Sequence, residues 1–421
     1  MLRLIQNLIR REWPVRLLSP LIGKFNPFLP EHAADPYPGY HRLRASDPVY
    51  FSPALRGWIL TRHTDVVAVL SDPRFSVDRR QSTVFRRLNA FGSLAPEFAE
   101  AITRNLLMLD PPDHTRLRRL VSRAFTPRMV ERLRGRVESL VDELLDAQRS
   151  ARSMDLIRDF AYPLPVTVIA EMLGVPIANR DRFKSWSDDL VTLLDPLQAT
   201  NGLEPAQRAY FELRDYFRGV FADRRRHPRE DLVSALVVDD EQGDALTEPE
   251  LVSLAMLILG AGHETTTNLI GNAAFALLRN QGERARLQQN PSLINSAVEE
   301  FLRYDSPIQT TDRVATEDCR IDGRQVRKGQ LVGLVLGAAN RDPEQFPDPD
   351  RLDISRTPNR HLAFGSGTHQ CAGMHLARLE GHVAISRFLA RFPGYAAAGD
   401  PVRGGRARFR GFLKLPCRVE P

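Results

Sequence analysis

One long apolar segment most limits how this chain can fold. From Thr247 to about Arg279, much of the sequence is apolar on every face of a helix. Such a helix has to pass through the interior of a protein, because no face of it suits water. Thr247 and Glu250 have the spacing of a capping box, so the helix is predicted to begin there, with Pro249 tolerated in its first turn. The rest of the fold must therefore pack around one central helix.

Helices are expected to dominate the remainder of the chain. Apolar residues at helical spacing predict further helices at 129–145, 207–226, 292–304 and 371–392. Strand patterns are shorter and predict a hairpin at 49–51 and 57–61, and later strands at 312–321, 325–326 and 331–336. The sequence therefore predicts a mainly α fold with a smaller β-rich portion.

The domain organisation is expected to be simple. No repeat, linker or composition break divides the 421 residues, so we expect one domain over 35–421 and an N-terminal extension over 1–34. The extension fits an amphipathic helix on a membrane surface, an ordinary surface helix or a loose leader. No apolar run reaches the roughly 18 uncharged residues of a membrane span, and no secretory signal is visible. We expect a cytoplasmic monomer.

The charge balance is basic and is dominated by arginine. Lys and Arg number 58 against 52 Asp and Glu, a net charge of +6, and only four of the basic residues are lysines. The arginines are dispersed along the chain, and no motif that reads a nucleic-acid groove accompanies them. We therefore expect no nucleic-acid partner.

The most informative segment is FGSGTHQCAG, residues 364–373. Gly365 and Gly367 permit a tight turn, and Cys371 is expected to open the helix that follows, where unpaired N–H groups and the helix dipole favour a thiolate. Gly373 would let a bulky group approach the backbone. With three cysteines in the chain, neither a disulfide framework nor a multi-thiol zinc cluster is expected.

Cys371 allows several interpretations. It can be an inert buried thiol, a zinc ligand together with His369 and His375, a nucleophile, or a single thiolate ligand to a metal that brings its other ligands, as haem does. The zinc site lacks a fourth ligand, and the sequence singles out no base for a nucleophile. A lone cysteine in a glycine-flanked loop fits haem ligation best.

This segment resembles the haem-binding loop of the cytochrome P-450 superfamily, F-x-x-G-x-[HR]-x-C-x-G. The family's other motifs occur in order: H-x-x-x-R at 114–118, [AG]-G-x-[DE]-T-[TS] at 261–266, and E-x-x-R at 300–303. The resemblance covers the chain from about residue 35 to the end. It implies the cytochrome P-450 fold, with haem b buried between the long central helix and the cysteine-loop helix.

The resemblance also implies residue roles. The axial iron ligand would be Cys371, and the expected haem-binding residues are His114, Arg118, Ala261, Arg313, Phe364, Gly365, His369, Cys371 and Gly373. The expected proton relay is Glu264 and Thr265. The expected structural brace is Glu300, Arg303 and Arg351. The expected substrate-pocket positions are Leu257, Ala261, Ile308 and Phe412, with the segment 85–108.

The implied activity is a haem-thiolate monooxygenase that inserts one oxygen atom of O2 into a hydrophobic small molecule by hydroxylation or epoxidation. Because no flavin or iron–sulfur domain is present, NAD(P)H-derived electrons are expected to arrive through a ferredoxin and its reductase. A basic chain would steer an acidic ferredoxin, and the candidate docking residues are Arg116, Arg119, Arg123, Arg360 and Arg378.

Two alternatives to this activity are a haem-thiolate peroxygenase, which needs no redox partner, and a non-catalytic haem or ligand binder such as a gas sensor. Glu264 and Thr265 weigh against both. Superfamily members with peroxygenase chemistry typically replace this acid–alcohol pair, and a sensor has no need of an oxygen-activation motif.

Overall fold

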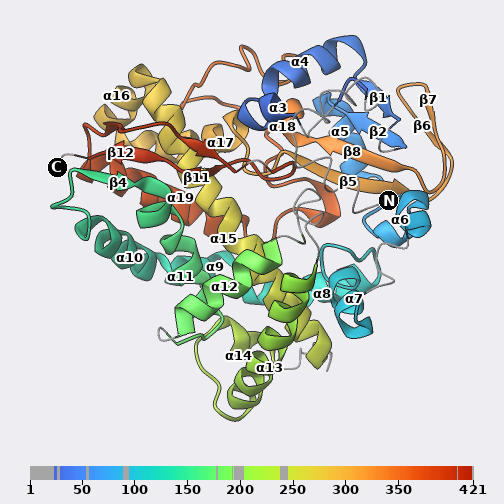
Figure 1. Ribbon diagram of the computed structural model, residues 1–421, viewed down its shortest axis with the longest axis horizontal. Helices are drawn as coiled ribbons and strands as arrows, with labels where there is room; N and C mark the ends of the chain where they lie inside the picture. The colour runs from blue at the N-terminus through green and yellow to red at the C-terminus, as the bar shows by residue number, and fades with distance from the viewer. Residues whose placement is uncertain are drawn as a thin grey trace.

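The computed structural model describes residues 23–25, 29–53, 56–88, 94–176, 179–191, 193, 203–237, 245–404 and 406–419. The described part is mainly helical, with small sheets, as the sequence predicts (Figure 1). None of its helices has the length and hydropathy of a membrane span. Most of the predicted N-terminal extension, residues 1–34, lies outside the described residues, and its final residues form α3 (Pro30–Ala34).

The helices include short 3-10 and π turns, labelled η. After α3 they are α4 (Tyr37–Ser46), α5 (His63–Ser71), η1 (Arg79–Gln81), α6 (Thr83–Leu88), α7 (Pro96–Thr103), α8 (Asp113–Ala124), α9 (Pro127–Arg132), α10 (Arg134–Asp146), η2 (Ile157–Ala161), α11 (Pro163–Met172), α12 (Arg180–Val191), α13 (Glu204–Arg226), α14 (Leu232–Leu236), α15 (Glu248–Arg279), α16 (Gln281–Gln289), η6 (Pro291–Leu293), α17 (Ile294–Tyr304), α18 (Leu336–Ala339), η7 (Gly367–His369) and α19 (Met374–Arg391).

The strands are short. They are β1 (Val49–Ser52), β2 (Gly57–Leu60), β3 (Phe75–Ser76), β4 (Ser153–Asp155), β5 (Thr310–Ala315), β6 (Cys319–Ile321), β7 (Arg324–Val326), β8 (Leu331–Val335), β9 (Ala396–Ala397), β10 (Val402–Arg403), β11 (Phe412–Lys414) and β12 (Pro416–Arg418). The largest sheet has the order β1-β2-β8-β5-β3. Its β1–β2 hairpin is antiparallel, and β2 pairs with β8 in parallel, which joins the two predicted strand-rich regions in one sheet.

The long central helix forms as predicted. The Thr247 hydroxyl accepts a hydrogen bond from the Glu250 backbone N–H, and the Glu250 side chain accepts one from the Thr247 N–H, so the capping box is complete. The helix α15 then runs diagonally through the middle of the molecule, between the sheet at the upper right and α12, α13 and α14 at the bottom (Figure 1). Its side chains are buried along most of its length because α11, α12, α13 and α19 pack around it.

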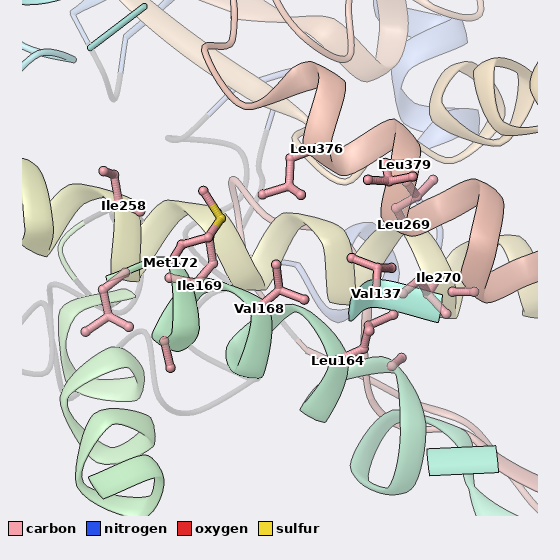
Figure 2. Close-up of a cluster of buried hydrophobic side chains, with 14 of the residues drawn as sticks. Val137, Leu164, Val168, Ile169, Met172, Ile258, Leu269, Ile270, Leu376 and Leu379 are labelled. Carbon is pink, nitrogen blue, oxygen red and sulfur yellow. The ribbon is translucent and has the colours of Figure 1, made fainter. Parts of the chain in front are cut away.

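The core between these helices is apolar. Figure 2 shows α15 lying between α19, which supplies Leu376 and Leu379, and α11, which supplies Leu164 and Val168. Val137 of α10 joins the same cluster. Since each buried side chain of this size stabilises the fold by roughly 1.5–3 kcal/mol, this cluster fixes the position of α15 relative to α19.

Two predicted helices differ from the observed ones. The segment predicted as one helix at 129–145 is two helices, α9 and α10, which meet at Leu133. The helix predicted over 371–392 begins only at Met374, with Gly373 as its N-cap residue, so Cys371 precedes the helix rather than opening it. The Cys371 N–H donates to the Phe364 carbonyl oxygen at 2.9 Å, which closes the loop on itself before the helix starts.

Candidate active site

The cysteine loop is held in a tight turn by two glycines. Gly365 and Gly367 have φ angles of 68° and 70°, which side chains other than hydrogen disfavour. A Cβ atom on Gly367 would also lie 2.6 Å from the carbonyl oxygen of Leu70 at the end of α5, so no larger residue fits there. The loop is therefore pressed against α5, and its other side presents Cys371 to a cavity.

The environment of the Cys371 thiol contains opposing influences. Burial raises the pKa of Cys371, whereas the backbone N–H of Gly373 and the positive charges of Arg118 and Arg378 lower it. The net shift is upward. Donors that would stabilise a thiolate are thus in place, but burial keeps the free thiol protonated until a cation binds the sulfur.

A cavity of about 350 Å³ lies beside Cys371 and under α15. The structure brings to it most of the residues that the sequence singles out. They are His114, Arg118, Leu257, Ala261, Thr265, Ile308, Arg313, Phe364, Gly365, His369, Cys371 and Gly373. The predicted segment 85–108 contributes Leu106, Leu107 and Met108 to the cavity wall. Residues 89–93 of that segment lie outside the described residues.

One predicted pocket residue is wrong. Phe412 does not line the cavity: it packs against Phe275 at a ring-centroid distance of 4.9 Å and lies under the guanidinium of Arg403. Phe409, three residues earlier, lines the cavity instead because it pairs as an isolated β-bridge with Ile308 and shares its position in the wall.

Four basic side chains gather at one edge of the cavity. The rings of His114 and His369 lie 4.1 Å apart between centroids, with Arg118 and Arg313 beside them. Burial and the neighbouring cations lower the pKa of His369 to about 3, and they lower the pKa of His114 as well. The cluster formed by His114, Arg118, Arg313 and His369 is the basic cluster below.

Among the described residues, no carboxylate forms an ion pair with a member of the basic cluster. Both ring nitrogens of His114 are buried without a hydrogen-bond partner. The nearby carboxylate of Asp110 is already engaged by the Ser76 hydroxyl and by the Val77 N–H at 3.1 Å. Unsatisfied buried donors beside surplus positive charge are costly unless an anion binds to them. The residues present therefore fit a flat group that carries carboxylates at one edge.

The backbone near Cys371 leaves room for such a group. Gly373 lines the cavity, and a Cβ atom placed on it would meet no other side chain or backbone atom within 4 Å. A flat macrocycle can thus approach the backbone beside the sulfur. Among the described residues, no three His, Cys, Asp or Glu side chains converge on one point, so His369, Cys371 and His375 do not form a zinc site.

On the opposite side of the cavity, α15 presents small and polar residues. The Thr265 hydroxyl donates to the carbonyl oxygen of Ala261 at 3.1 Å and lines the cavity. Gly262 lies close to α11: a Cβ atom on it would lie 2.8 Å from the side-chain terminus of Ile169. The close approach of α11 therefore fixes this part of α15.

The side chain of Glu264 points in a different direction from that of its neighbour Thr265. Its carboxylate forms an ion pair with Arg406 at 2.5 Å and accepts a hydrogen bond from the Asn268 amide at 3.2 Å. It is not among the residues that line the cavity. The acid and the alcohol of the motif thus lie next to each other in the helix, with the acid held by the C-terminal segment.

The predicted brace contains one wrong residue. Glu300 and Arg303 are fully buried and form a bidentate pair, with N···O distances of 2.7 and 2.8 Å. The third member is Arg356, whose Nε lies 3.2 Å from Glu300, and not Arg351. Arg351 contributes only its backbone carbonyl oxygen, which accepts from Arg303 at 3.2 Å, while its own side chain is exposed.

The brace reaches the segment that leads to the cysteine loop. The Asn359 amide donates to Glu300 at 3.1 Å, and Arg303 donates to the carbonyl oxygens of Asn340 and Pro349 at 2.9 and 2.8 Å. These bonds tie α17 to the chain on either side of residue 351. They fix the segment that leads to the cysteine loop, and none of the residues that form them lines the cavity.

Several cavity residues were not predicted from the sequence. Glu380 of α19 is buried beneath α15, and burial raises its pKa to about 8 despite a hydrogen bond with Thr266. Its position on the apolar face of a helix was a signal, because one acid among leucines and valines is unusual. Arg79, Asp312 and Arg408 also line the cavity, and nothing local in the sequence brings these three segments together.

Two of the arginines predicted to dock a redox partner already form ion pairs within the chain. Arg116 pairs with Glu250 at the start of α15, and Arg378 pairs with Glu299 at 2.7 and 2.8 Å. Arg123 and Arg360 are exposed and Arg119 is half-buried.

Comparisons with known proteins agree with this geometry. The cytochrome P450 family model matches residues 53–396. The chain is 43% identical to cytochrome P450 107B1 of Saccharopolyspora erythraea, over 92% of this chain and 95% of that one, and 43% identical to the cytochrome P450 monooxygenase PikC of Streptomyces venezuelae, over 92% of each.

Solved structures of cytochromes P450 also superimpose on this chain. The epothilone D-bound cytochrome P450epoK superimposes with a TM-score of 0.88 at 33% identity, covering 94% of this chain and 99% of that one. P450BioI in complex with a fatty-acyl-ligated acyl carrier protein superimposes with a TM-score of 0.86 at 39% identity, covering 93% and 100%. The chain belongs to the cytochrome P450 family of haem-dependent monooxygenases.

Proposed function

We propose that this protein is a haem-thiolate monooxygenase in which Cys371 is the axial ligand of haem b. The observation that carries the proposal is that one cavity holds a single cysteine of the described chain together with a basic cluster that pairs with no described carboxylate. Phe364, Gly365, Gly373 and Ala261 would contact the macrocycle, since all four line the same cavity.

In this proposal the basic cluster holds the haem propionates. His114 and Arg118 are four residues apart on α8, so their side chains leave the helix on the same face. His369 comes from the cysteine loop and Arg313 from β5, so three elements would close on the carboxylates. Charge-assisted hydrogen bonds of this kind are short and strong, and would satisfy the orphaned nitrogens of His114.

When bound through a thiolate, haem activates O2 so that one oxygen atom is inserted into a substrate by hydroxylation or epoxidation. The protein's part is to deliver protons and exclude water. Thr265 lines the cavity, and its hydroxyl can turn from the Ala261 carbonyl oxygen to donate toward the cavity. Glu264, the next residue, would supply protons to Thr265 after leaving Arg406.

The presence of Glu264 and Thr265 favours a monooxygenase over a peroxygenase or a non-catalytic gas sensor, which have no need of a relay from solvent. The apolar wall around Leu257, Ile308 and Phe409 excludes water from the reaction and suits a hydrophobic substrate. Relatives support a small-molecule substrate: one is named vitamin D(3) 25-hydroxylase, at 42% identity, and another the polyketide biosynthesis P450 PksS, at 38%.

The ligand assignment is tested by replacing the cysteine. Cys371→Ala should abolish the thiolate-type absorption band of the reduced, CO-bound protein, because no other described cysteine lines the cavity. Cys319→Ala is the matched control, since Cys319 is buried at the start of β6 and does not line the cavity, and it should leave the band unchanged. A thiolate-type band that survives in Cys371→Ala would disprove the assignment.

The electron donor is proposed to be a ferredoxin, reduced by an NAD(P)H-dependent ferredoxin reductase in the cytoplasm. The net charge of +6 favours an acidic partner, and the candidate docking residues are Arg116, Arg119, Arg123, Arg360 and Arg378. Raising the salt concentration should slow electron transfer from the ferredoxin, because screening weakens this attraction. A rate that is independent of ionic strength would contradict this docking mode.

A further inference from the structure

Three polar residues form a cluster next to the cysteine loop but outside the cavity. They are Glu299 of α17, His361 of the segment that leads to the loop, and Arg378 of α19, and none of them lines the cavity. Arg378 donates to both oxygens of the Glu299 carboxylate, from Nε at 2.7 Å and from Nη2 at 2.8 Å. We call these three residues the loop triad.

His361 fixes the orientation of the Glu299 carboxylate. Its side chain is only 3% exposed, and its Nδ1 accepts a hydrogen bond from the Ala363 N–H at 3.2 Å. Because Nδ1 is an acceptor, the ring hydrogen lies on Nε2, which donates to Glu299 at 3.2 Å. Glu299 therefore connects the entry of the cysteine loop with α19, against which α17 packs.

The loop triad holds one carboxylate and one guanidinium in balance. Burial would raise the pKa of Glu299, but the hydrogen bonds from Arg378 and His361 lower it to about 2, so the carboxylate is ionised at neutral pH. The side chains of Glu299 and Arg378 are 26% and 29% exposed, so water screens their charges only in part. The electrostatic effect of Arg378 on its surroundings thus depends on Glu299.

Arg378 also faces the cysteine loop. Its guanidinium carbon lies 4.7 Å from the centre of the Phe364 ring, which is a cation–π contact. Burial raises the pKa of Cys371, and the positive charges of Arg118 and Arg378 oppose that effect. Arg118 belongs to the basic cluster and would be paired with a haem carboxylate. Arg378 does not line the cavity, so it would keep Glu299 as its partner when haem is bound.

A charge near the sulfur affects the reduction of the iron that the sulfur would bind. Reduction adds one electron to the iron, so a nearby positive charge stabilises the reduced form and a nearby negative charge stabilises the oxidised form. As long as the pair between Glu299 and Arg378 is intact, the two charges largely cancel. Removal of either partner leaves a single charge beside the loop, and its sign depends on which partner was removed.

We propose that Glu299 and Arg378 are positioning residues that set the reduction potential of the haem iron, Arg378 by its charge beside Cys371 and Glu299 by neutralising that charge. His361 holds Glu299 in place. The step that they influence is the transfer of one electron from the redox partner, which converts ferric iron to ferrous iron. This inference rests on the proposed haem-thiolate function and adds a control of its electron uptake.

The test measures the midpoint potential of the haem iron. The haem-loaded protein is titrated with dithionite and redox mediators at fixed neutral pH and ionic strength, without ferredoxin, so that partner docking cannot contribute. Glu299→Gln should raise the potential, and Arg378→Leu should lower it. Each shift should correspond to at least about a threefold change in the equilibrium between ferric and ferrous iron, or about 28 mV at about 59 mV per tenfold change for one electron.

Further variants separate charge from structure. Arg378→Lys keeps the positive charge, so its potential should stay within about threefold of the wild-type equilibrium, and the double variant Glu299→Gln/Arg378→Leu should return close to it because both charges are removed. Glu138→Gln is the matched control. Glu138 is 34% exposed and pairs with Arg387 of the same helix α19 at 2.9 Å, and neither residue lines the cavity, so the potential should not change.

Three results would overturn the proposal. They are equal potentials in Glu299→Gln, Arg378→Leu and the wild-type protein, an equal shift in Arg378→Lys and Arg378→Leu, and a shift in Glu138→Gln as large as that in Glu299→Gln. Each variant is first checked for the thiolate-type band of the reduced CO complex, which shows that it folds and binds haem through sulfur. If Arg378→Leu fails this check, Glu299→Gln, Arg378→Lys and Glu138→Gln decide the question.

Failure of the loop triad and failure of the enzyme assignment give different results. If the haem-thiolate assignment is wrong, the thiolate-type band is absent from the wild-type protein as well. If only the role of the loop triad is wrong, the band is present in the wild-type protein and in the variants, and their potentials do not differ.

Discussion

Arg406 of the C-terminal segment forms an ion pair of 2.5 Å with Glu264 of the central helix, directly beside Thr265. This contact connects the relay acid to a segment far away in the sequence. It also gives Glu264 two positions in the proposed mechanism: paired with Arg406, as observed, and turned toward Thr265. Arg406 is therefore expected to act as a positioning residue for proton delivery.

A double-mutant cycle tests this relationship. Glu264→Gln should lower the turnover number, and Arg406→Ala should change it in a protein that retains Glu264. In Glu264→Gln, however, Arg406→Ala should have little further effect, because the partner carboxylate is gone. The coupling energy in the turnover number should be about 1 kcal/mol or more. Additive effects of the two substitutions, measured with the same substrate and redox partners, would show that the pair does not act on the reaction.

Thr265→Ala should divert reducing equivalents from product to hydrogen peroxide. Thr265 lines the cavity, and its loss removes a hydroxyl that can turn from the Ala261 carbonyl oxygen to donate toward the cavity. The ratio of product formed to NAD(P)H consumed should fall several-fold. Thr267→Val is the control, because Thr267 is buried in the same helix but does not line the cavity. Unchanged coupling in Thr265→Ala would rule out its role in the relay.

Arg356 should matter for stability where Arg351 does not. Arg356→Leu removes a guanidinium from the buried Glu300 carboxylate, and a hydrogen bond to a charged group contributes about 1.5–3 kcal/mol. Arg351→Leu keeps the backbone carbonyl oxygen that Arg303 uses, so the free energy of unfolding should change by less than about 0.5 kcal/mol. Urea denaturation of the two variants measures this difference. Equal losses would restore Arg351 as the third member of the brace.

Glu380 should make stability depend on pH. Its pKa is about 8 in the folded protein against an ordinary value of 4.5, so the folded state keeps a proton that the unfolded chain loses. The stabilising effect of this proton is complete below about pH 4.5 and is lost progressively as the pH rises to about 8, at a total cost on the order of a few kcal/mol.

The variant Glu380→Gln lacks this titration. Relative to the wild-type protein, its free energy of unfolding should rise as the pH increases from about 4.5 to 8, and then stay constant. Denaturation followed by circular dichroism at several pH values measures the difference. Parallel pH profiles for the two proteins would show that Glu380 is ionised in the folded state.

The sequence was sufficient to predict the features that depend on local pattern. The capping box and the apolar length of α15 defined the central helix, and the glycine-flanked cysteine identified the loop that the structure places at the cavity. His114 and Arg118 could be paired because helical spacing alone puts them on one face. In each case the relevant partner lies within one turn of helix or one short loop.

The predictions that proved wrong are those in which the direction of a side chain decides which residue makes the contact. Arg351 and Arg356 both follow the same proline-rich stretch, and the sequence does not show which of them turns its guanidinium toward Glu300. The side chains of Phe409 and Phe412 point in different directions from the backbone. The direction of the Phe409 side chain depends on the β-bridge between Phe409 and Ile308. The ion pair between Arg406 and Glu264 could not be predicted from the sequence, because a contact between segments that are far apart in the chain produces no local sequence pattern.

The cavity is assembled from residues that extend from Leu70 to Phe409, and the largest sheet pairs Trp58 with Val332 in parallel. During synthesis on the ribosome, therefore, no early portion of the nascent chain can complete this pocket. Contacts of such long sequence separation form slowly. Incorporation of the prosthetic group is accordingly expected to follow translation, so that the supply of haem at that moment, and not the rate of chain elongation, sets the yield of loaded enzyme.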